Sequence, residues 1–171
     1  MPPYDVPPSD VEALVRAAQR GDRLALNRLL RELAPVVGPI CGAIALDQGD
    51  DAMQETMIAV VRNLGSLREP AAVQGWARRI ATREAVRVVR RRGMVTATET
   101  ADIPTTTDIE SAVDIRDTLA RLGPEQRAVL VLRDVAGMSE AEAAAALDVA
   151  PGTVKSRLHR ARAAFRKGWQ A

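Results

Sequence analysis

Residues 138–167 contain the pattern that most restricts the fold of this chain, two helical segments separated by a short turn. Ser139 and Glu142 have the spacing of a capping box, which predicts the start of an alanine-rich helix that runs to Leu147. The segment DVAPG predicts a turn, and a last helix is expected to begin at Thr153. The lengths and polarity of these segments match a helix-turn-helix.

The last helix is amphipathic. Val154, Leu158, Ala161 and Phe165 fall on one side at helical spacing, which predicts that this side packs against a core. Residues 152–168 contain six Lys or Arg and no acid, so we expect the exposed sides to contact DNA phosphates and base edges. The residues predicted to contact DNA on this helix are Thr153, Lys155, Ser156, Arg157, His159, Arg160 and Arg162.

A second basic helix is predicted between Trp76 and Arg92. Small apolar residues from Ala77 to Val88 repeat on its core side, and residues 78–92 contain seven Arg and one Glu. This density favours contact with a DNA duplex, whereas binding to a membrane surface would need large apolar anchors where this helix has mostly Ala. The predicted DNA contacts are Trp76, Arg79, Arg83, Arg87 and Arg90, with burial in the core as an equal alternative for Trp76.

The rest of the chain predicts an all-α fold of two small helical domains, because no segment alternates with period two. Residues 1–8, with four prolines, form an expected disordered lead. Residues 9–96 form the first domain, in which Ser9 and Glu12 fit a capping box, Asp22 caps the next helix, and Pro35 with Gly38 should interrupt that helix. Residues 97–111 form an expected acidic, Thr-rich linker, and residues 112–171 form the second domain, with a helix break at Gly123-Pro124.

Several functional classes are disfavoured by what the sequence contains. One cysteine, Cys41, and one histidine, His159, allow no disulfide framework and no usual zinc cluster, so we expect no metal and no cofactor. No phosphate-binding Gly loop and no nucleophile with a base are present, so we expect no enzyme and no catalytic residue. The N-terminus does not resemble a secretory signal, and no apolar stretch is expected to approach the ~20 residues of a membrane span, which predicts a cytoplasmic protein without membrane contact.

From Asp10 to Trp169 the chain resembles the extracytoplasmic-function sigma factors of the sigma-70 family, small two-domain promoter-recognition subunits of bacterial RNA polymerase. The resemblance lies in RAAQRGDRLALNRLL, DDAMQETMIAVV and WARRIATREAVRVVRRR in the first domain. In the second domain it lies in LARLGPEQRAVLVLRDVAGMSEAEAAAALDVAPGTVKSRLHRAR, which is the more specific match.

The resemblance implies a role for each segment. Asp50, Asp51, Gln54 and Glu55 would dock on the clamp coiled coil of the largest subunit of core RNA polymerase. The stretch from Leu67 to Arg92 would read and open the minus-ten promoter element, and the last helix would read the minus-thirty-five element in the major groove. The linker would run through polymerase toward the RNA exit channel. An anti-sigma factor is a further candidate partner, because sequestration is common in the family.

One departure from the family pattern concerns strand opening. Family members often have several aromatic residues in the opening segment, whereas this chain has only Trp76, with Leu67 and Val73 at positions where Phe is frequent. Because stacking is worth ~1–3 kcal/mol per base, we expect weaker opening or dependence on a base pocket in the loop. The alternative function is a helix-turn-helix regulator that binds a palindromic operator without polymerase.

Overall fold

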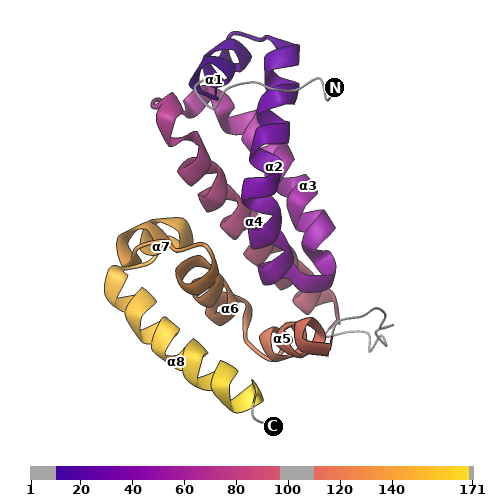
Figure 1. The fold of residues 1–171 in the computed structure, drawn as a ribbon, viewed down its shortest axis with the longest axis vertical. Helices are drawn as coiled ribbons and strands as arrows, with labels where there is room; N and C mark the ends of the chain where they lie inside the picture. Colours follow the sequence, from indigo (N-terminus) through magenta and orange to yellow (C-terminus); the bar gives the residue numbers. More distant parts are fainter. Residues whose placement is uncertain (1–10, 97–109, 170–171) are drawn as a thin grey trace.

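The structure, a computed structural model, describes residues 11–96 and 110–169. Within these ranges the chain is helical and has no β-strand, as the sequence predicts. Figure 1 shows helices α1–α4, hereafter the first half, in the upper part of the molecule and α5–α8, the second half, below them. The expected lead, the Ser9 cap and nearly all of the expected linker lie outside the described residues, while Glu110 and Ser111 begin α5.

The first half consists of α1 (Val11–Gln19), α2 (Arg23–Ala45), α3 (Gly49–Asn63) and α4 (Val73–Thr96), with short 3-10 turns at 46–48, 64–66 and 70–72. The predicted cap at Asp22 is confirmed, since its Oδ1 accepts hydrogen bonds from the Leu24 and Ala25 amides at 2.9 and 3.0 Å. Leu29, Leu33 and Val37 on α2 are buried, and α2 packs against α1, α3 and α4. One apolar side of α2 therefore organises this core.

The predicted interruption of α2 at Pro35 and Gly38 is wrong, because the helix continues through Pro35 and Pro39 to Ala45. The two prolines are four residues apart and both are exposed, so they lie on the solvent side of α2. The carbonyl groups that lose a helical donor there can bind water, while Leu33, Val37 and Ile40 remain buried on the opposite side. Tertiary packing thus outweighs the local signal.

The second half consists of α5 (Glu110–Ala120), α6 (Pro124–Leu130), a π-helical turn η5 (Val131–Val135), α7 (Glu140–Leu147) and α8 (Pro151–Trp169). The Ser139 capping box is confirmed: the Glu142 amide donates to Ser139 Oγ at 3.2 Å, and the Ser139 amide donates to Glu142 Oε2 at 2.8 Å. Helix α8 begins at Pro151 rather than at Thr153, because proline suits the first helical position.

The two halves have separate cores, and α6, η5 and α7 of the second half contact the first half. The second core contains Val129, Leu132 and Leu158, whereas Ala128 and Val131 of α6 and η5 are buried against the first core. Consecutive residues of one segment thus pack in opposite directions. Helices α6 and α7 therefore both join the second half to the first.

The continuous helical stretch Arg23–Ser66 contains an 18-residue window with a mean hydropathy of 1.6, which is long and apolar enough to cross a membrane. By this measure the expectation that no such stretch exists is wrong. Core helices of soluble proteins have the same composition, and 39% of this window is buried inside the molecule. Leu33, Val37 and Ile44 of the stretch lie in the first core.

Candidate nucleic-acid interface

Helix α8 is held by its apolar side, as predicted. Val154 and Ala161 are fully buried and Leu158 is nearly so, which fixes the rotation of the helix on α6 and α7. Lys155, Ser156, His159 and Arg160 are consequently exposed, whereas Thr153 and Arg157 are half-buried. The sequence-predicted residues thus lie on a common helix, with most of their side chains open to solvent.

Arg162 differs from the other cations predicted on α8. Its guanidinium forms a two-point ion pair with Asp134 of η5, at 2.5 and 3.0 Å. The hydrogen bonds that Arg162 donates to Asp134 raise the pKa of Arg162 further above its ordinary value. Together with Phe165, the pair borders an apolar hollow of 320 Å³ between α5, η5 and α8. Arg162 therefore holds α8 to η5 in this structure.

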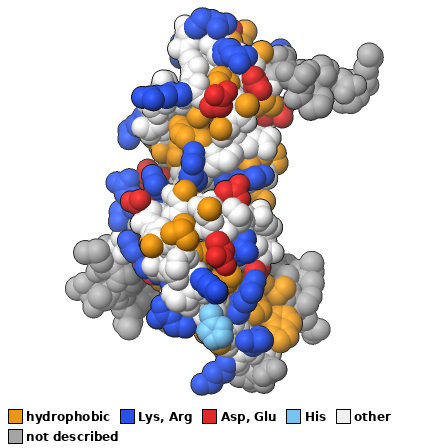
Figure 2. Space-filling model, turned by 90° about the vertical axis from the view of Figure 1, so that its left-hand side faces the viewer, with side chains coloured by type: hydrophobic (Ala, Val, Ile, Leu, Met, Phe, Trp, Pro, Cys, Tyr) orange, Lys and Arg blue, Asp and Glu red, His pale blue; other side chains and the backbone are white. Residues whose placement is uncertain are grey.

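Helix α4 presents four arginines at spacings of three or four residues, which we call the α4 arginine face: Arg79, Arg83, Arg87 and Arg90. All four side chains are exposed, while Ala77, Ala81 and Ala85 on the other side of the helix are fully buried. Figure 2 shows Lys and Arg side chains along both halves of this side of the molecule, with fewer Asp and Glu among them. The predicted division of α4 into a core side and a cationic side is confirmed.

A cleft of 640 Å³ is lined by both basic helices, α4 and α8. Four of its lining arginines are on α4, and Arg157 on α8 lines it as well. The cleft also contains Glu125, at the start of α6, which forms an ion pair with Arg90. The hydrogen bond from Arg90 lowers the pKa of Glu125, and the positive charges of Arg90 and Arg157 add to this effect. The cleft-lining residues of α4 are Thr82, Arg83, Val86, Arg87, Arg90 and Arg91.

Trp76 is half-buried and packs against the first core. It also lines a hollow of 290 Å³ together with Gly75, Arg79 and, from the second half, Met138 and Glu142. The core alternative for Trp76 is therefore met in part, because one portion of the indole is packed and another is accessible. Arg79 lies beside it.

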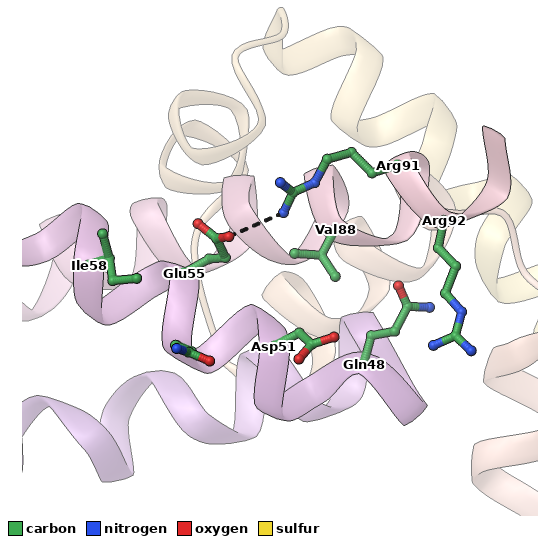
Figure 3. A pocket seen from close by; sticks show the side chains of 8 residues that line it. Gln48, Asp51, Glu55, Ile58, Val88, Arg91 and Arg92 are labelled. Carbon is green, nitrogen blue, oxygen red and sulfur yellow. Dashed lines mark ion pairs between the residues drawn. The ribbon is translucent and has the colours of Figure 1, made fainter. Parts of the chain in front are cut away.

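The four residues predicted to dock on polymerase, which we call the docking cluster, lie in the first two turns of α3. Asp50, Asp51 and Gln54 are exposed and Glu55 is half-buried. Asp51 and Glu55 line a hollow of 410 Å³ together with Arg91 and Arg92 of α4. Figure 3 shows these side chains around the hollow. Gln54 lines the same hollow, whereas Asp50 does not.

An ion pair of 3.5 Å between Glu55 Oε1 and Arg91 Nη2 spans this hollow (Figure 3). The docking cluster is thus linked directly to α4. A helix N-terminus with acidic residues is also locally stable, since Asp50 and Asp51 oppose the positive end of the α3 dipole.

Three acidic residues that the sequence analysis did not identify form ion pairs with arginines distant in the sequence. Glu125 contacts Arg90, Asp134 contacts Arg162, and Asp47 contacts Arg116 of α5 at 2.5 Å. Each pairs with an arginine at least 28 positions away, so no local pattern could have revealed it. Among residues 11–96 and 110–169, no group of three or more His, Cys, Asp or Glu is arranged to hold a metal ion.

Comparison with known protein families agrees with this geometry. Residues 42–94, covering α3 and most of α4, match Sigma-70 region 2. Residues 112–165, covering α5 to α8, match Sigma-70 region 4. The chain is 36% identical to the ECF RNA polymerase sigma factor SigM of Mycobacterium tuberculosis, over 91% of this chain and 82% of that protein. The chain therefore belongs to the extracytoplasmic-function sigma factors, a non-catalytic family whose members direct core RNA polymerase to promoters.

Further relatives extend the likeness over nearly the whole chain. The ECF RNA polymerase sigma-E factor of Haemophilus influenzae is 28% identical, over 88% of this chain and 90% of that protein. The sigma factor RpoE of Bartonella quintana, solved with the anti-sigma factor NepR, has a TM-score of 0.68 at 23% identity and covers 85% of this chain and 96% of its own. CnrH, solved with the cytosolic domain of CnrY, has a TM-score of 0.65 at 23% identity and covers 92% of this chain and 95% of its own. These two structures share the fold of two helical domains.

Proposed function

We propose that this sigma factor recognises the minus-ten element with α4 and the minus-thirty-five element with α8, while α3 holds core RNA polymerase. The observation that carries the proposal is the pair of basic helices, each fixed by a buried apolar side and each on a different half of the chain. Two modest DNA contacts joined through one chain raise each other's effective concentration. Promoter selection would then require both.

On α8, the exposed polar side chains of the first three turns are the proposed readers of the upstream element. Lys155, Arg160 and His159 project from the side opposite the buried Val154 and Leu158. The N-terminal amides of α8 add positive potential at which a phosphate can dock. Thr153, Ser156, Arg157 and Arg162 complete the proposed set, with Arg162 needing to exchange its Asp134 contact for DNA.

On α4, the arginine face is proposed to follow the backbone near the downstream element. Trp76 is proposed to stack on or pocket an unpaired base, since its accessible edge borders a hollow. Leu67 and Val73 are buried in the first core and contribute no stacking surface. Strand opening would therefore depend on Trp76 and the adjoining loop.

The docking cluster Asp50, Asp51, Gln54 and Glu55 is proposed to bind the clamp coiled coil of the largest polymerase subunit. The exposed carboxylates and the neighbouring hollow offer a polar surface for a partner helix.

The proposed division of the chain is a lead of residues 1–8, a first domain of residues 9–96, a linker of residues 97–111 and a second domain of residues 112–171. Polymerase would perform all phosphoryl transfer, and the sigma chain would use no catalytic residue, cofactor or metal.

An anti-sigma factor is a proposed regulator, because RpoE of Bartonella quintana, which shares this fold, was solved with the anti-sigma factor NepR. The proposed location is the cytoplasm, with nucleoid association when the chain is bound to polymerase. A regulator that binds an operator without polymerase is the less favoured alternative, since the matched families are sigma-70 regions.

Transcription in vitro tests this proposal. Purified chain is combined with core RNA polymerase and a genomic fragment library, and promoter-specific transcripts are sequenced. Replacing Arg157 and Arg160 together with Ala should lower transcription about tenfold or more, since each lost base contact is worth ~1–3 kcal/mol. The matched control replaces Arg20 and Arg31, two exposed arginines of the first half, and should transcribe normally. Unchanged transcription from the Arg157 and Arg160 variant would contradict the assignment.

A further inference from the structure

The loop between α3 and α4 is anchored by buried residues at every third position. Leu64, Leu67, Pro70 and Val73 are buried, and the pairs of residues between them are exposed. The regular backbone structure of this loop consists of two short 3-10 turns, at 64–66 and 70–72. The shape of the loop between its anchors therefore depends on side chains that bind its backbone from outside.

Gln19, the last residue of α1, binds the backbone of this loop. Its Nε2 donates to the Leu64 carbonyl at 2.9 Å and to the Leu67 carbonyl at 2.8 Å. A side-chain amide has two N–H groups, so Gln19 uses both on the loop. The end of a helix leaves carbonyl groups without partners, and Leu67 has extended backbone with φ of −73° and ψ of 108°. Gln19 thus satisfies two loop carbonyls from 45 and 48 positions away in the sequence.

Helix α1 is itself fixed in place. Val15 is fully buried in the first core, and α1 packs against both 3-10 turns of the loop. Directly after Gln19 the chain makes a turn, in which the Gly21 amide donates to the Ala18 carbonyl at 3.0 Å. Gly21 has a φ of +95°, a conformation that favours glycine. The position of Gln19 is therefore set by the packing of α1 and by the turn that ends it.

The loop leads directly to the residue that is proposed to contact an unpaired base. Ala72, at the end of the second 3-10 turn, lines the same hollow of 290 Å³ as Trp76. The polar side chains that the loop exposes are Ser66, Arg68 and Glu69. Hydrogen bonds to base edges discriminate only when the groups that make them are held in a fixed geometry, whereas stacking on an aromatic ring tolerates any base. Base selectivity should therefore depend on how firmly the loop is held.

We propose that Gln19 is a positioning residue for the minus-ten element, which holds residues 64–72 so that their exposed polar side chains can discriminate between unpaired bases. The inference rests on the proposed function, in which Trp76 and this loop meet the opened strand. Gln19 acts through the loop and makes no base contact of its own.

The effect of Gln19 should be confined to minus-ten selectivity. The docking cluster lies in the first two turns of α3, whereas the loop follows the last turn of that helix, so polymerase docking should not depend on Gln19. Figure 1 shows α1 at the far end of the first half from α8, so recognition of the minus-thirty-five element should not depend on Gln19 either.

The first test measures whether Gln19 holds the loop in the free chain. Gln19→Met keeps the length and removes both donors, Gln19→Lys keeps donors, and Asn27→Met removes an exposed amide of α2 as the matched control. Hydrogen exchange of the amides of residues 64–72 is followed by mass spectrometry, and circular dichroism checks that each variant is helical. Gln19→Met should exchange there about three- to tenfold faster than the unchanged chain, since lost hydrogen bonds favour local opening. Equal exchange in Gln19→Met and Asn27→Met would overturn the proposal.

The second test measures base selectivity in the complete holoenzyme. The probe is a promoter fragment recovered from the transcription library, in which each minus-ten position is replaced in turn by all four bases. Single-round transcript yield gives the preference for the best base at each position. In Gln19→Met this preference should fall about five- to tenfold at one position or more, the order expected for two lost hydrogen bonds. Gln19→Lys and Asn27→Met should keep the preference, and a Gln19→Met holoenzyme as selective as the unchanged one would contradict the positioning role.

Two further readouts separate positioning from a general structural role. The affinity of the labelled chain for core RNA polymerase should change by less than about twofold in Gln19→Met, as expected for an exposed residue away from that contact. The loss of transcription on altering the minus-thirty-five element should also be unchanged. If both readouts fall together with minus-ten selectivity, Gln19 stabilises the first half as a whole and the proposal is wrong.

Failure of the proposed function gives a different result. If the unchanged holoenzyme prefers no base at any minus-ten position, the proposed role of α4 and the inference about Gln19 both fail. If the unchanged holoenzyme is selective and Gln19→Met is equally selective, only the inference about Gln19 fails.

Discussion

Helices α4 and α8 both carry positive charge, but they differ in how many of their cations form ion pairs with acidic side chains. On α4, Arg87 pairs with Glu84, Arg90 with Glu125, and Arg91 with Glu55. On α8, Arg162 is paired, while Lys155, His159 and Arg160 form no ion pair within residues 11–96 and 110–169. Counting cations would rank α4 as the stronger DNA surface. Counting ion pairs shows that more of the cations of α4 have partners, so under the proposed function α4 would exchange contacts on binding DNA.

The two helices are also seated by different side chains. Helix α4 rests on Ala77, Ala81 and Ala85, all fully buried, so its backbone approaches its neighbours closely. Helix α8 rests on Val154 and Leu158, which fill more volume. The two helices should therefore respond differently to mutation. Shortening a buried side chain should destabilise the chain most on α8, and enlarging a buried side chain should destabilise it most on α4.

Leu158→Ala should have the largest effect of the changes considered. It removes most of a side chain that is 6% exposed in the second core, and such truncations lower the free energy of unfolding by about 2–5 kcal/mol. Urea unfolding followed by circular dichroism measures the loss. His159→Ala, on the exposed side of α8, is the control and should stay within about 0.5 kcal/mol. A loss below 1 kcal/mol for Leu158→Ala would mean that Leu158 does not hold α8 in place.

Ala81→Leu tests the seating of α4. Ala81 is 0% exposed, so a leucine must displace α2 or α3, and overpacking of this kind destabilises proteins by about 1–3 kcal/mol. The matched change is Ala164→Leu on the exposed side of α8, where the added side chain meets solvent. Thermal unfolding of both variants decides the comparison. Equal stability of the two would show that α4 is not closely packed at Ala81.

Much of the fold could be predicted from sequence because its signals act over a few residues. Asp22 and Ser139 accept hydrogen bonds from amides two or three positions along the chain. Pro124 begins α6 because its fixed φ suits a first helical turn. The apolar sides of α4 and α8 were also predictable, since helical periodicity depends only on spacing.

The continuation of α2 could not be predicted locally. Pro35 and Pro39 are helix breakers in isolation, and only the burial of Leu33 and Val37 against other helices makes the unbroken helix favourable. The tertiary contacts that decide this outcome involve residues of α3 and α4. Sequence spacing within α2 contains no information about them.

The candidate site also contains residues that the sequence could predict and residues that it could not. The basic residues of α4 and α8 were found from charge density, whereas their acidic partners were missed. Glu125 is 35 positions from Arg90, and Asp134 is 28 positions from Arg162. Glu125 read alone is an ordinary acid in the first turn of a helix. Only the folded chain shows that it pairs with Arg90 of α4.

The smallest expected effect is a pH-dependent change in melting temperature. It distinguishes the Glu125–Arg90 ion pair, which joins the two halves, from the Glu142–Ser139 capping contact within the second half. Arg90 lowers the pKa of Glu125, so its folded pKa lies below the unfolded value of about 4.5. The stabilisation is therefore fully present above that value and is lost as pH falls through the lowered folded pKa. Melting temperatures of the unchanged chain and of Glu125→Gln should differ slightly at pH 7 and converge in acid.

Glu142 provides the control for this pH dependence. Its pKa is lowered by the backbone amide of Ser139 in the same helix, and Gln can make the same capping contact. Glu142→Gln should therefore leave the melting temperature nearly unchanged at pH 7. Raising the salt concentration should reduce the effect of Glu125→Gln, because an exposed ion pair is screened, and should leave the capping contact nearly unaffected. A Glu125→Gln effect that persists unchanged in acid and in high salt would show that Glu125 acts by packing and not by its charge.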